Sequence, residues 1–280
     1  MSKLTSIASI TCWYGKFPWY LPYFLHSCSF NSTVDFYIIT DNIGKIENKP
    51  DNVKIVHKTL DEIKTTASEK LGFTVNIGYP YKLCDFKPAY GFLFPEIIKD
   101  YDFWGITDID IVYGSIRNFM TEEILNNHDI ISSRHDYITG SFCLFRNNDY
   151  VNQLFMKSKD YKMVFTNPVH FCFDECNFLF EKLKNGISIL DIDNPIVSMT
   201  YLVKKEEREN HLRVFFDFII VEGLPGNIIW NNGRLIYKEM YEVMFYHLIQ
   251  FKNSCTNRKI LNPIPEMFSF TKTAIVKIII

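Results

Sequence analysis

A short apolar run followed by two acidic residues, near the middle of the chain, most constrains how this sequence can fold. Residues 103–106 predict a buried strand, and Asp108 and Asp110 follow directly after it. Residues two apart in an extended chain point to the same side, so both carboxylates can face one point. Carboxylate oxygens suit Mg²⁺ or Mn²⁺ holding a diphosphate. The stretch therefore predicts a metal site at a strand end, although Asp-x-Asp also occurs in turns and helix caps.

Length and composition narrow the class of protein. The 280 residues suffice for one large domain or two small ones, and a hydrophobic content of 47% excludes wholesale disorder. A net charge of −2 gives no basic field for nucleic acid, so we expect no nucleic-acid partner. The seven cysteines have no framework spacing, which favours free thiols in a reducing compartment. With no signal segment and no run of transmembrane length, we expect a cytoplasmic protein.

The spacing of apolar residues predicts an α/β fold with a β-rich C-terminal part. Thr59 and Glu62 form a capping box at the start of one helix, which we expect to end at Gly72. Asn232 and Gly233 lie between apolar runs and predict a hairpin. The expected strands are residues 4–12, 34–40, 53–57, 103–106, 129–133, 141–146, 187–192, 214–221, 228–230, 234–237 and 244–252, and the expected helices are residues 19–28, 60–71, 81–98, 115–126, 148–159 and 173–184.

Polar and aromatic residues after the first two strands are candidates for nucleotide contact. The loop after the first strand contains Trp13, Tyr14 and Gly15, and it can hold a nucleotide or serve packing alone. Asp41 follows the second strand, where open α/β sheets bind their ligands. It can accept a hydrogen bond from a ribose or base, or it can simply form a turn.

Charged residues within apolar segments are further candidates. Lys82, Asp85 and Lys87 lie beside an otherwise apolar predicted helix, and burying charge without a partner is costly. We expect an internal ion pair between Asp85 and one lysine, contact with a ligand, or both. Asp174 and Glu175 lie in the first turn of another predicted helix. The helix dipole favours acids there, but one of them can also act as a base or contact an acceptor sugar.

In their order, these elements resemble the GT-A fold glycosyltransferases, which transfer a sugar from a nucleotide-diphosphate donor. Asp108-Ile109-Asp110 looks like the DxD metal motif of those enzymes. In several GT-A families a later histidine completes the metal site and a lysine shortly after it contacts the diphosphate, and His247 and Lys252 match that pattern. The glycine that the family carries beside this histidine is absent here. The resemblance implies a GT-A-like Rossmann-type mixed sheet flanked by helices.

The resemblance also implies roles for individual residues. It implies a single domain over residues 1–280, with a nucleotide-binding part at about 1–115 and an acceptor part at about 116–280. Asp108, Asp110 and His247 would hold Mn²⁺ or Mg²⁺. Asp174 and Glu175 occupy a place where GT-A enzymes often carry an acid that faces the acceptor; an inverting reaction needs such a base and a retaining one does not. The residues expected to contact the nucleotide sugar are Trp13, Tyr14, Gly15, Asp41, Lys82, Asp85, Lys87, Asp108 and Lys252.

We therefore expect a metal-dependent hexosyltransferase of the bacterial surface-glycan type. Its partners would be a nucleotide-diphosphate sugar donor and a glycan or glycolipid acceptor in polysaccharide biosynthesis. The tail, residues 271–280, is apolar with two lysines, and we expect it either to lie on the inner face of the cell membrane or to pack on the body. Two alternatives stay open: a nucleotidyltransferase acting on sugar phosphates, and a non-catalytic glycan-binding protein with a degenerate transferase fold.

Overall fold

A seven-stranded mixed sheet lies at the centre of the computed structural model, which describes residues 4–217 and 219–278. Its strands at the middle are mostly apolar, and every residue of β4 is buried. Such strands are covered on both faces, as in α/β proteins. From one edge to the other the strands are β3 (Val53–His57), β2 (Val34–Thr40), β1 (Ile7–Cys12), β4 (Phe103–Thr107), β7 (Phe142–Arg146), β6 (Ile130–Ser132) and β8 (Val214–Phe216).

The direction of the strands changes across this sheet. Strands β3, β2, β1 and β4 run parallel, with Ile7 paired to Val34 on one side and to Phe103 on the other. Strand β7 is antiparallel to both β4 and β6, and β8 is parallel to β6. The prediction of a mixed sheet flanked by helices, with a β-rich C-terminal part, is confirmed.

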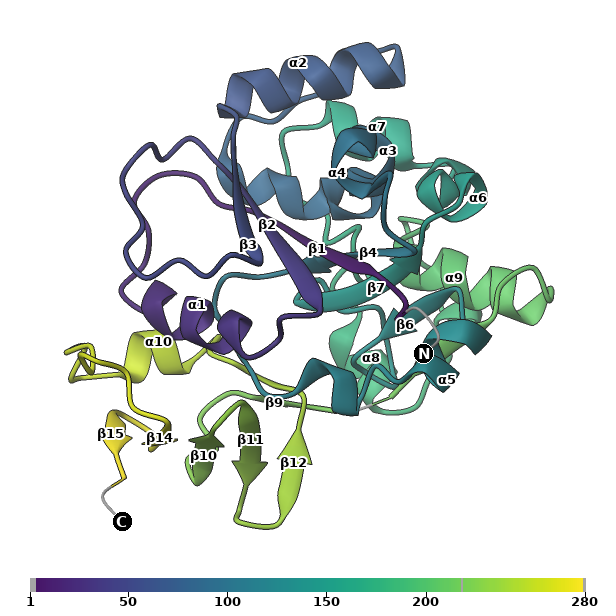
Figure 1. Cartoon of the computed structure of the whole chain (residues 1–280). Helices are drawn as coiled ribbons and strands as arrows, with labels where there is room; N and C mark the ends of the chain where they lie inside the picture. Colours follow the sequence, from purple (N-terminus) through teal and green to yellow (C-terminus); the bar gives the residue numbers. More distant parts are fainter. Residues whose placement is uncertain (1–3, 218, 279–280) are drawn as a thin grey trace.

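Helices cover both faces of the central sheet (Figure 1). On one face, Phe24 of α1 (Leu21–Ser29) packs edge-on against Phe36 of β2, with ring centroids 6.2 Å apart. On the other face, Phe86 stacks on Phe165 at 4.1 Å. The elements on this second face include α2 (Leu60–Leu71), the 3₁₀ helix η1 (Pro80–Ala89), α3 (Tyr90–Leu93), α4 (Pro95–Ile98), α6 (Asp149–Asn152), η3 (Leu154–Lys157), α7 (Tyr161–Thr166) and α9 (Met199–Arg208).

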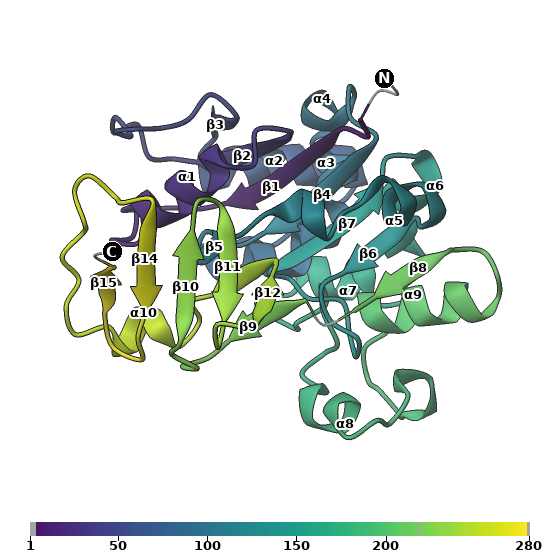
Figure 2. The ribbon, with the colours of Figure 1, turned by 60° about the horizontal axis from the view of Figure 1, so that its bottom comes forward.

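Two smaller sheets complete the C-terminal part. A three-stranded sheet has the order β5 (Ile111–Tyr113), β13 (Phe245–His247) and β9 (Ile220–Glu222). Figure 2 shows the strands of the second, antiparallel sheet side by side, with β15 and β12 at its edges. The predicted hairpin at Asn232 and Gly233 is confirmed, and both residues have the positive φ that its turn requires. The antiparallel strands are β12 (Tyr241–Val243), β11 (Arg234–Tyr237), β10 (Ile228–Asn231), β14 (Met267–Phe270) and β15 (Ile275–Lys277).

Several predicted helices are shorter than expected or are replaced by 3₁₀ turns. The helix expected over residues 81–98 is wrong as a continuous element, because Pro88 and Pro95 lack the N–H group that a helix interior needs. The helix expected over 173–184 is reduced to α8 (Phe180–Lys184), since Cys172, Asn177 and Phe178 have positive φ. The expected helices 115–126 and 148–159 are broken into η2 (Ile116–Asn118) with α5 (Glu122–Asn127), and α6 with η3.

Three predicted strands also differ. Residues 187–192 contain the 3₁₀ helix η4 (Ile189–Asp191) in place of a strand. Residues 214–221 are divided between β8 and β9, which belong to different sheets, and residue 218 lies outside the described residues. Residues 244–252 contain β13 followed by the helical turn α10 (Phe251–Ser254). In the part of the chain that the structure describes, we find no helix with the length and apolarity needed to cross a membrane.

A fully buried ion pair fixes the 3₁₀ helix η1 to the segment that follows α7. Lys82 Nζ lies 2.7 Å from Asp85 Oδ2, and both side chains have an exposed fraction of 0%. Lys82 Nζ also donates to the carbonyls of Val164 and Val169, at 2.8 and 2.6 Å. The internal ion pair that was expected between Asp85 and one lysine is therefore formed with Lys82.

The carboxylate of Asp85 also holds the backbone that leads to Asp174. It accepts hydrogen bonds from the N–H groups of Phe171 and Phe173, at 3.0 and 2.9 Å. His170 Nδ1 lies 3.2 Å from the same carboxylate. Burial alone would raise the pKa of the Asp85 carboxyl, but these donors and Lys82 outweigh it and hold that pKa below its usual value. This carboxylate is therefore a structural anchor for the loop.

Removing the lysine tests this role. We expect Lys82→Met to lower the free energy of unfolding by about 3 kcal/mol, because Asp85 then keeps a buried charge without its closest cation. Urea denaturation measures the change. The control is Lys205→Met, which removes the exposed partner of Glu209 at 4.0 Å and should cost less than about 1 kcal/mol. Equal losses in the two variants would contradict the anchoring role.

Candidate functional site

The two acidic residues lie where the chain leaves the central sheet and enters the three-stranded sheet. Asp108 directly follows β4, and Asp110 directly precedes β5. The backbone is fixed on both sides: the N–H of Asp108 donates to the carbonyl of Ser141, and the carbonyl of Asp110 accepts from the N–H of Leu248 at 2.8 Å. The carboxylates thus extend from a segment that is held by two sheets.

Strand pairing brings a histidine from the C-terminal part to these acids. In the three-stranded sheet, His247 of β13 pairs with Ile111 of β5, the residue after Asp110. On its other side His247 pairs with Glu222 of β9. One row across this sheet is therefore formed by Ile111, His247 and Glu222, and it brings Asp110, the residue before Ile111, close to His247.

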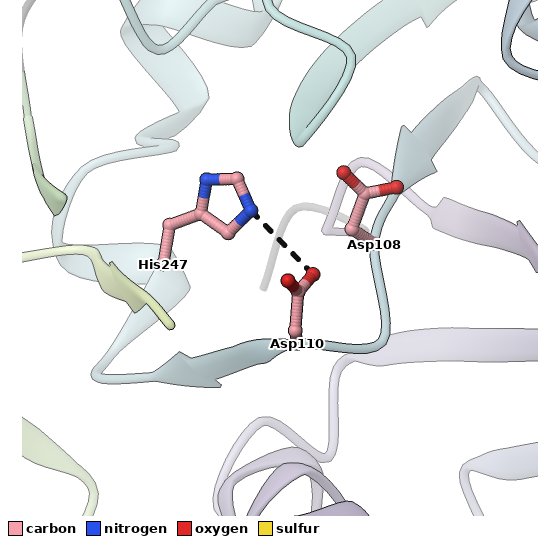
Figure 3. A group of neighbouring side chains, drawn as sticks. All are labelled: Asp108, Asp110 and His247. Atoms are coloured by element: carbon pink, nitrogen blue, oxygen red, sulfur yellow. Dashed lines mark ion pairs between the residues drawn. The ribbon is translucent and has the colours of Figure 1, made fainter. Parts of the chain in front are cut away.

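The three side chains present a donor set for a divalent cation (Figure 3). One ligand atom from each of Asp108, Asp110 and His247 lies within 4.8 Å of the others, and His247 Nε2 is 3.5 Å from Asp110 Oδ1. Figure 3 shows the imidazole ring of His247 facing the carboxylate of Asp110, with the carboxylate of Asp108 beside them. Two carboxylates with one imidazole suit Mn²⁺ or Mg²⁺. The residues predicted to form the metal site are thus brought together, and their chemistry fits the ion.

Two lysines flank the acids. Lys252 Nζ lies 2.6 Å from Asp110 Oδ2, and Lys87 Nζ lies 2.6 Å from Asp108 Oδ1. Burial alone would raise the pKa of the Asp110 carboxyl, but hydrogen bonds and charge from His247 and Lys252 hold that pKa well below its usual range. The lowered pKa favours the carboxylate form of Asp110, which is the form that a metal ligand needs.

Glu222 contacts the imidazole of His247 on the side away from Asp110, and no local pattern in the sequence predicts this contact. His247 Nδ1 lies 3.0 Å from Glu222 Oε1, which leaves Nε2 facing the acids. Arg134 donates to Glu222 Oε2 at 2.9 Å and forms a two-pronged pair with Asp136 at 2.8 and 2.9 Å. Burial lowers the pKa of His247, but the hydrogen bonds to Asp110 and Glu222 outweigh it and raise that pKa to about 10. A divalent cation bound at Nε2 would take the place of the proton there. Only the pairing of β9 with β13, which is remote in sequence, reveals this residue.

A cavity of about 750 Å³ opens beside the acids. This is an ordinary volume for a small-molecule site. Its walls contain the metal-site residues, part of the loop after β1, and residues from the segment around Asp174. Besides the metal-site residues, the lining includes Trp13, Tyr14, Tyr81, Lys87, His170, Cys172, Asp174, Glu175, Phe178 and Lys252.

Gly140 joins Lys87 to the second pair of acids. Lys87 Nζ donates to the carbonyl of Gly140 at 2.9 Å, and the N–H of Gly140 donates to Glu175 Oε1 at 2.7 Å. A Cβ atom at position 140 would lie only 2.5 Å from Asp174 Oδ2, so the close approach requires glycine. Burial, and then the charge of Glu175, raise the pKa of the Asp174 carboxyl well above its usual value. Burial also raises the pKa of Glu175, so the pair is suited to holding a proton.

Some of the remaining residues that were predicted to contact the nucleotide sugar line the cavity, and others do not. Trp13 and Tyr14 line the cavity. The N–H of Gly15 donates to Asp41 Oδ1 at 2.8 Å, so Asp41 is engaged with the loop of Trp13 and Tyr14. Neither Gly15 nor Asp41 lines the cavity, and the same is true of Lys82 and Asp85. Asp174 and Glu175 do line it, but from a turn and not from the first turn of a helix.

Comparison with known proteins gives a family and a set of similar folds. Residues 9–278 match the model of a family described as "Family of unknown function (DUF6625)". No curated protein sequence matches the chain. Three solved structures of glycosyltransferases, as expected from the resemblance, are similar to it. The galactosyltransferase LgtC, in complex with donor and acceptor sugar analogs, is 10% identical over 78% of this chain and 76% of that chain, with a TM-score of 0.36. Mouse xyloside xylosyltransferase 1, in its apo form, is 9% identical over 87% of this chain and 96% of that chain, with a TM-score of 0.45. GlyE of Streptococcus pneumoniae TIGR4 is 11% identical over 55% of this chain and 38% of that chain, with a TM-score of 0.33.

The support that Glu222 gives to His247 can be tested through metal affinity. We expect Glu222→Gln to weaken Mn²⁺ binding about 10- to 100-fold, because outer partners orient a ligating histidine. Isothermal titration calorimetry with MnCl₂ measures the affinity. The control is Glu242→Gln, which removes another glutamate paired with an arginine on a strand, 2.5 Å from Arg234. An unchanged affinity in Glu222→Gln would contradict the orienting role.

Proposed function

This chain belongs to the family of unknown function DUF6625, and we propose that it is a metal-dependent glycosyltransferase that uses a nucleotide-diphosphate sugar. The observation that carries the proposal is the meeting of Asp108, Asp110 and His247 at one point. Lys252 lies at the same point, and the cavity beside it is large enough for a nucleotide sugar. This combination serves a reaction in which a diphosphate leaves with growing negative charge.

Each group at the acidic end of the cavity has a role in this reaction. Asp108, Asp110 and His247 would hold Mn²⁺ or Mg²⁺. When bound, the ion supplies positive charge to the leaving diphosphate. Lys252 is paired with Asp110 in the structure. Once its ammonium group leaves Asp110, it can contact the same diphosphate and stabilise the negative charge there. Trp13 and Tyr14 offer flat rings on the cavity wall, where a nucleobase can pack.

Lys87 and the acids at Gly140 serve the transferred sugar and the acceptor. Lys87 bridges Asp108 and Gly140, so it places a cation between the metal ligands and the second pair of acids. Asp174 and Glu175 supply the catalytic carboxyl groups in this proposal. In an inverting reaction one of them takes the proton of the acceptor hydroxyl. In a retaining reaction no base is needed, and the pair instead positions the sugar hydroxyls.

The proposal extends to substrates and location. The donor sugar is a hexose, the acceptor is a glycan or a lipid-linked glycan, and the product belongs to a bacterial surface polysaccharide. Residues 1–115 form the nucleotide-binding part and residues 116–280 the acceptor part. The enzyme works in the cytoplasm at the inner face of the membrane. The edge strand β15, which leaves Val276 and Lys277 exposed, offers one place for that contact.

The loop after β1 argues against the nucleotidyltransferase alternative. Such an enzyme binds phosphate through free backbone N–H groups of a glycine-rich loop. Here the N–H of Gly15 already donates to Asp41 at 2.8 Å. The cationic groups that can meet a phosphate lie instead at the acids, in Lys252 and Lys87.

Metal-dependent donor binding tests the proposal directly. We expect one nucleotide sugar from a panel to raise the melting temperature of the wild type only with Mn²⁺ present, since a ligand that binds the folded state stabilises it. Asp110→Asn and Asp108→Asn should abolish this shift and lower donor hydrolysis at least about 100-fold. Asp61→Asn, an exposed acid of α2, is the control. A wild type that binds and hydrolyses none of the donors would overturn the proposal.

The second pair of acids is tested apart from the metal. We expect Asp174→Asn and Glu175→Gln to lower sugar transfer about 100-fold or more through lost proton transfer or positioning, while the affinity for Mn²⁺ stays within about threefold. Liquid chromatography of donor and product measures transfer, and calorimetry measures Mn²⁺ binding. Full transfer in both variants would remove Asp174 and Glu175 from the catalytic role.

A further inference from the structure

Three aromatic rings form a rim at the mouth of the cavity. His170 lies edge-on to Tyr81, with ring centroids 4.8 Å apart, and edge-on to Phe178 at 5.6 Å. All three residues line the cavity. Tyr81 is 63% exposed and Phe178 is 57% exposed, so large parts of both rings face open space. We call Tyr81, His170 and Phe178 the aromatic rim.

The backbone holds Phe178 outward at a conformational cost. Its φ is +63°, and Asn177 before it has φ +51°. Positive φ is rare for a bulky residue, and such strain persists where the surroundings enforce it, often at binding sites. Here the N–H of Asn177 donates to the carbonyl of Cys172 at 2.9 Å, and its side-chain amide donates to the carbonyl of Phe171 at 2.8 Å. The exposed ring is therefore presented by a fixed loop.

A row of contacts leads from the metal ligands to the rim. Lys87 joins Asp108 to Gly140, whose N–H donates to Glu175. The other oxygen of Glu175 lies 3.5 Å from the sulfur of Cys172, which begins the loop that presents Phe178. The carboxyls of Asp174 and Glu175 thus lie between the metal ligands and the rim. The diphosphate would bind at the metal ligands, so a ligand that reaches these carboxyls from the rim is a different part of the substrates.

We propose that the aromatic rim is the acceptor subsite, and that it binds a pyranose ring by stacking the ring's C–H face on Phe178 and Tyr81. The inference rests on the proposed function and names its acceptor class. A pyranose has a face of C–H groups and an edge of hydroxyls, and the electron-rich face of an aromatic ring attracts the former. The polar groups beside the rings, such as the hydroxyl of Tyr81 and the carboxylate of Glu175, suit the hydroxyl edge. A lipid chain would need a wall without such groups.

Saturation-transfer NMR with simple glycosides tests the subsite. The probes are methyl β-D-glucopyranoside and methyl β-D-galactopyranoside, each with and without UDP and the diamagnetic ion Mg²⁺. In the wild type we expect the strongest saturation on H1, H3 and H5, the protons of one face. Phe178→Ala and Tyr81→Ala should weaken glycoside binding about three- to tenfold. Phe178→Tyr keeps a ring and should keep binding.

Matched controls separate the subsite from the rest of the enzyme. Tyr241 of β12 is also 57% exposed but does not line the cavity, so Tyr241→Ala should bind glycosides as the wild type does. Calorimetry with Mn²⁺ and UDP should give the same affinities in Phe178→Ala and Tyr81→Ala as in the wild type. Melting temperatures confirm that each variant is folded.

The outcomes distinguish this inference from the proposed function. If the wild type binds Mn²⁺ and UDP but saturates neither glycoside, or if Phe178→Ala and Tyr81→Ala bind glycosides as tightly as the wild type, the subsite is overturned and the proposed function stands. If the glycosides bind at the rim but no donor binds in the full nucleotide-sugar panel, the rim is a sugar site and the transferase is overturned. If neither class of ligand binds, both are overturned.

Discussion

The pairing of β13 with β5 is the constraint on which the site depends. Asp108 and Asp110 are placed by local sequence, at the junction of β4 and β5. His247 reaches them only because it pairs with Ile111, and Glu222 reaches His247 only because β9 pairs on the other side. A side-chain period of two residues means that a shift of one residue would turn His247 to the opposite face. The register of three short strands therefore decides whether these side chains can meet.

The side of the cavity that contains Asp174 and Glu175 is held by a buried ion pair, not by a sheet. Asp85 and Lys82 fix the segment that contains Phe171 and Phe173, and this segment leads directly to Asp174 and Glu175. The loop there takes backbone conformations that ordinary residues avoid. A fixed loop of this kind can keep two carboxyls close to Gly140 even though their pKa values are raised by burial. The site thus combines a rigid sheet with an anchored loop.

Local patterns allowed part of this structure to be predicted. The acid pair, the capping box of α2 and the hairpin at Gly233 each follow from neighbouring residues, and each is where the sequence placed it. Glu222 was missed because its role arises from strand pairing across distant segments. The different roles of Lys82 and Lys87 could not be predicted either. Only the packing of η1 places Lys82 in the core, paired with Asp85, and Lys87 at the cavity, paired with Asp108. The sequence predicts a helix around Asp174 because no local pattern indicates the positive φ of Cys172 and Phe178.

The charges at the site explain why metal and diphosphate would bind together. In the structure, the carboxylates of Asp108 and Asp110 are each engaged by an ammonium group, from Lys87 and Lys252. A divalent cation that joins these carboxylates adds two positive charges and weakens their hold on the lysines. That excess positive charge favours an anion, and a diphosphate with its several negative oxygens meets both the cation and Lys252. In the proposed reaction each ligand would therefore raise the affinity for the other by the same factor, as linkage requires. The paired charges of the acids and lysines would thus favour binding of the ion and the diphosphate together.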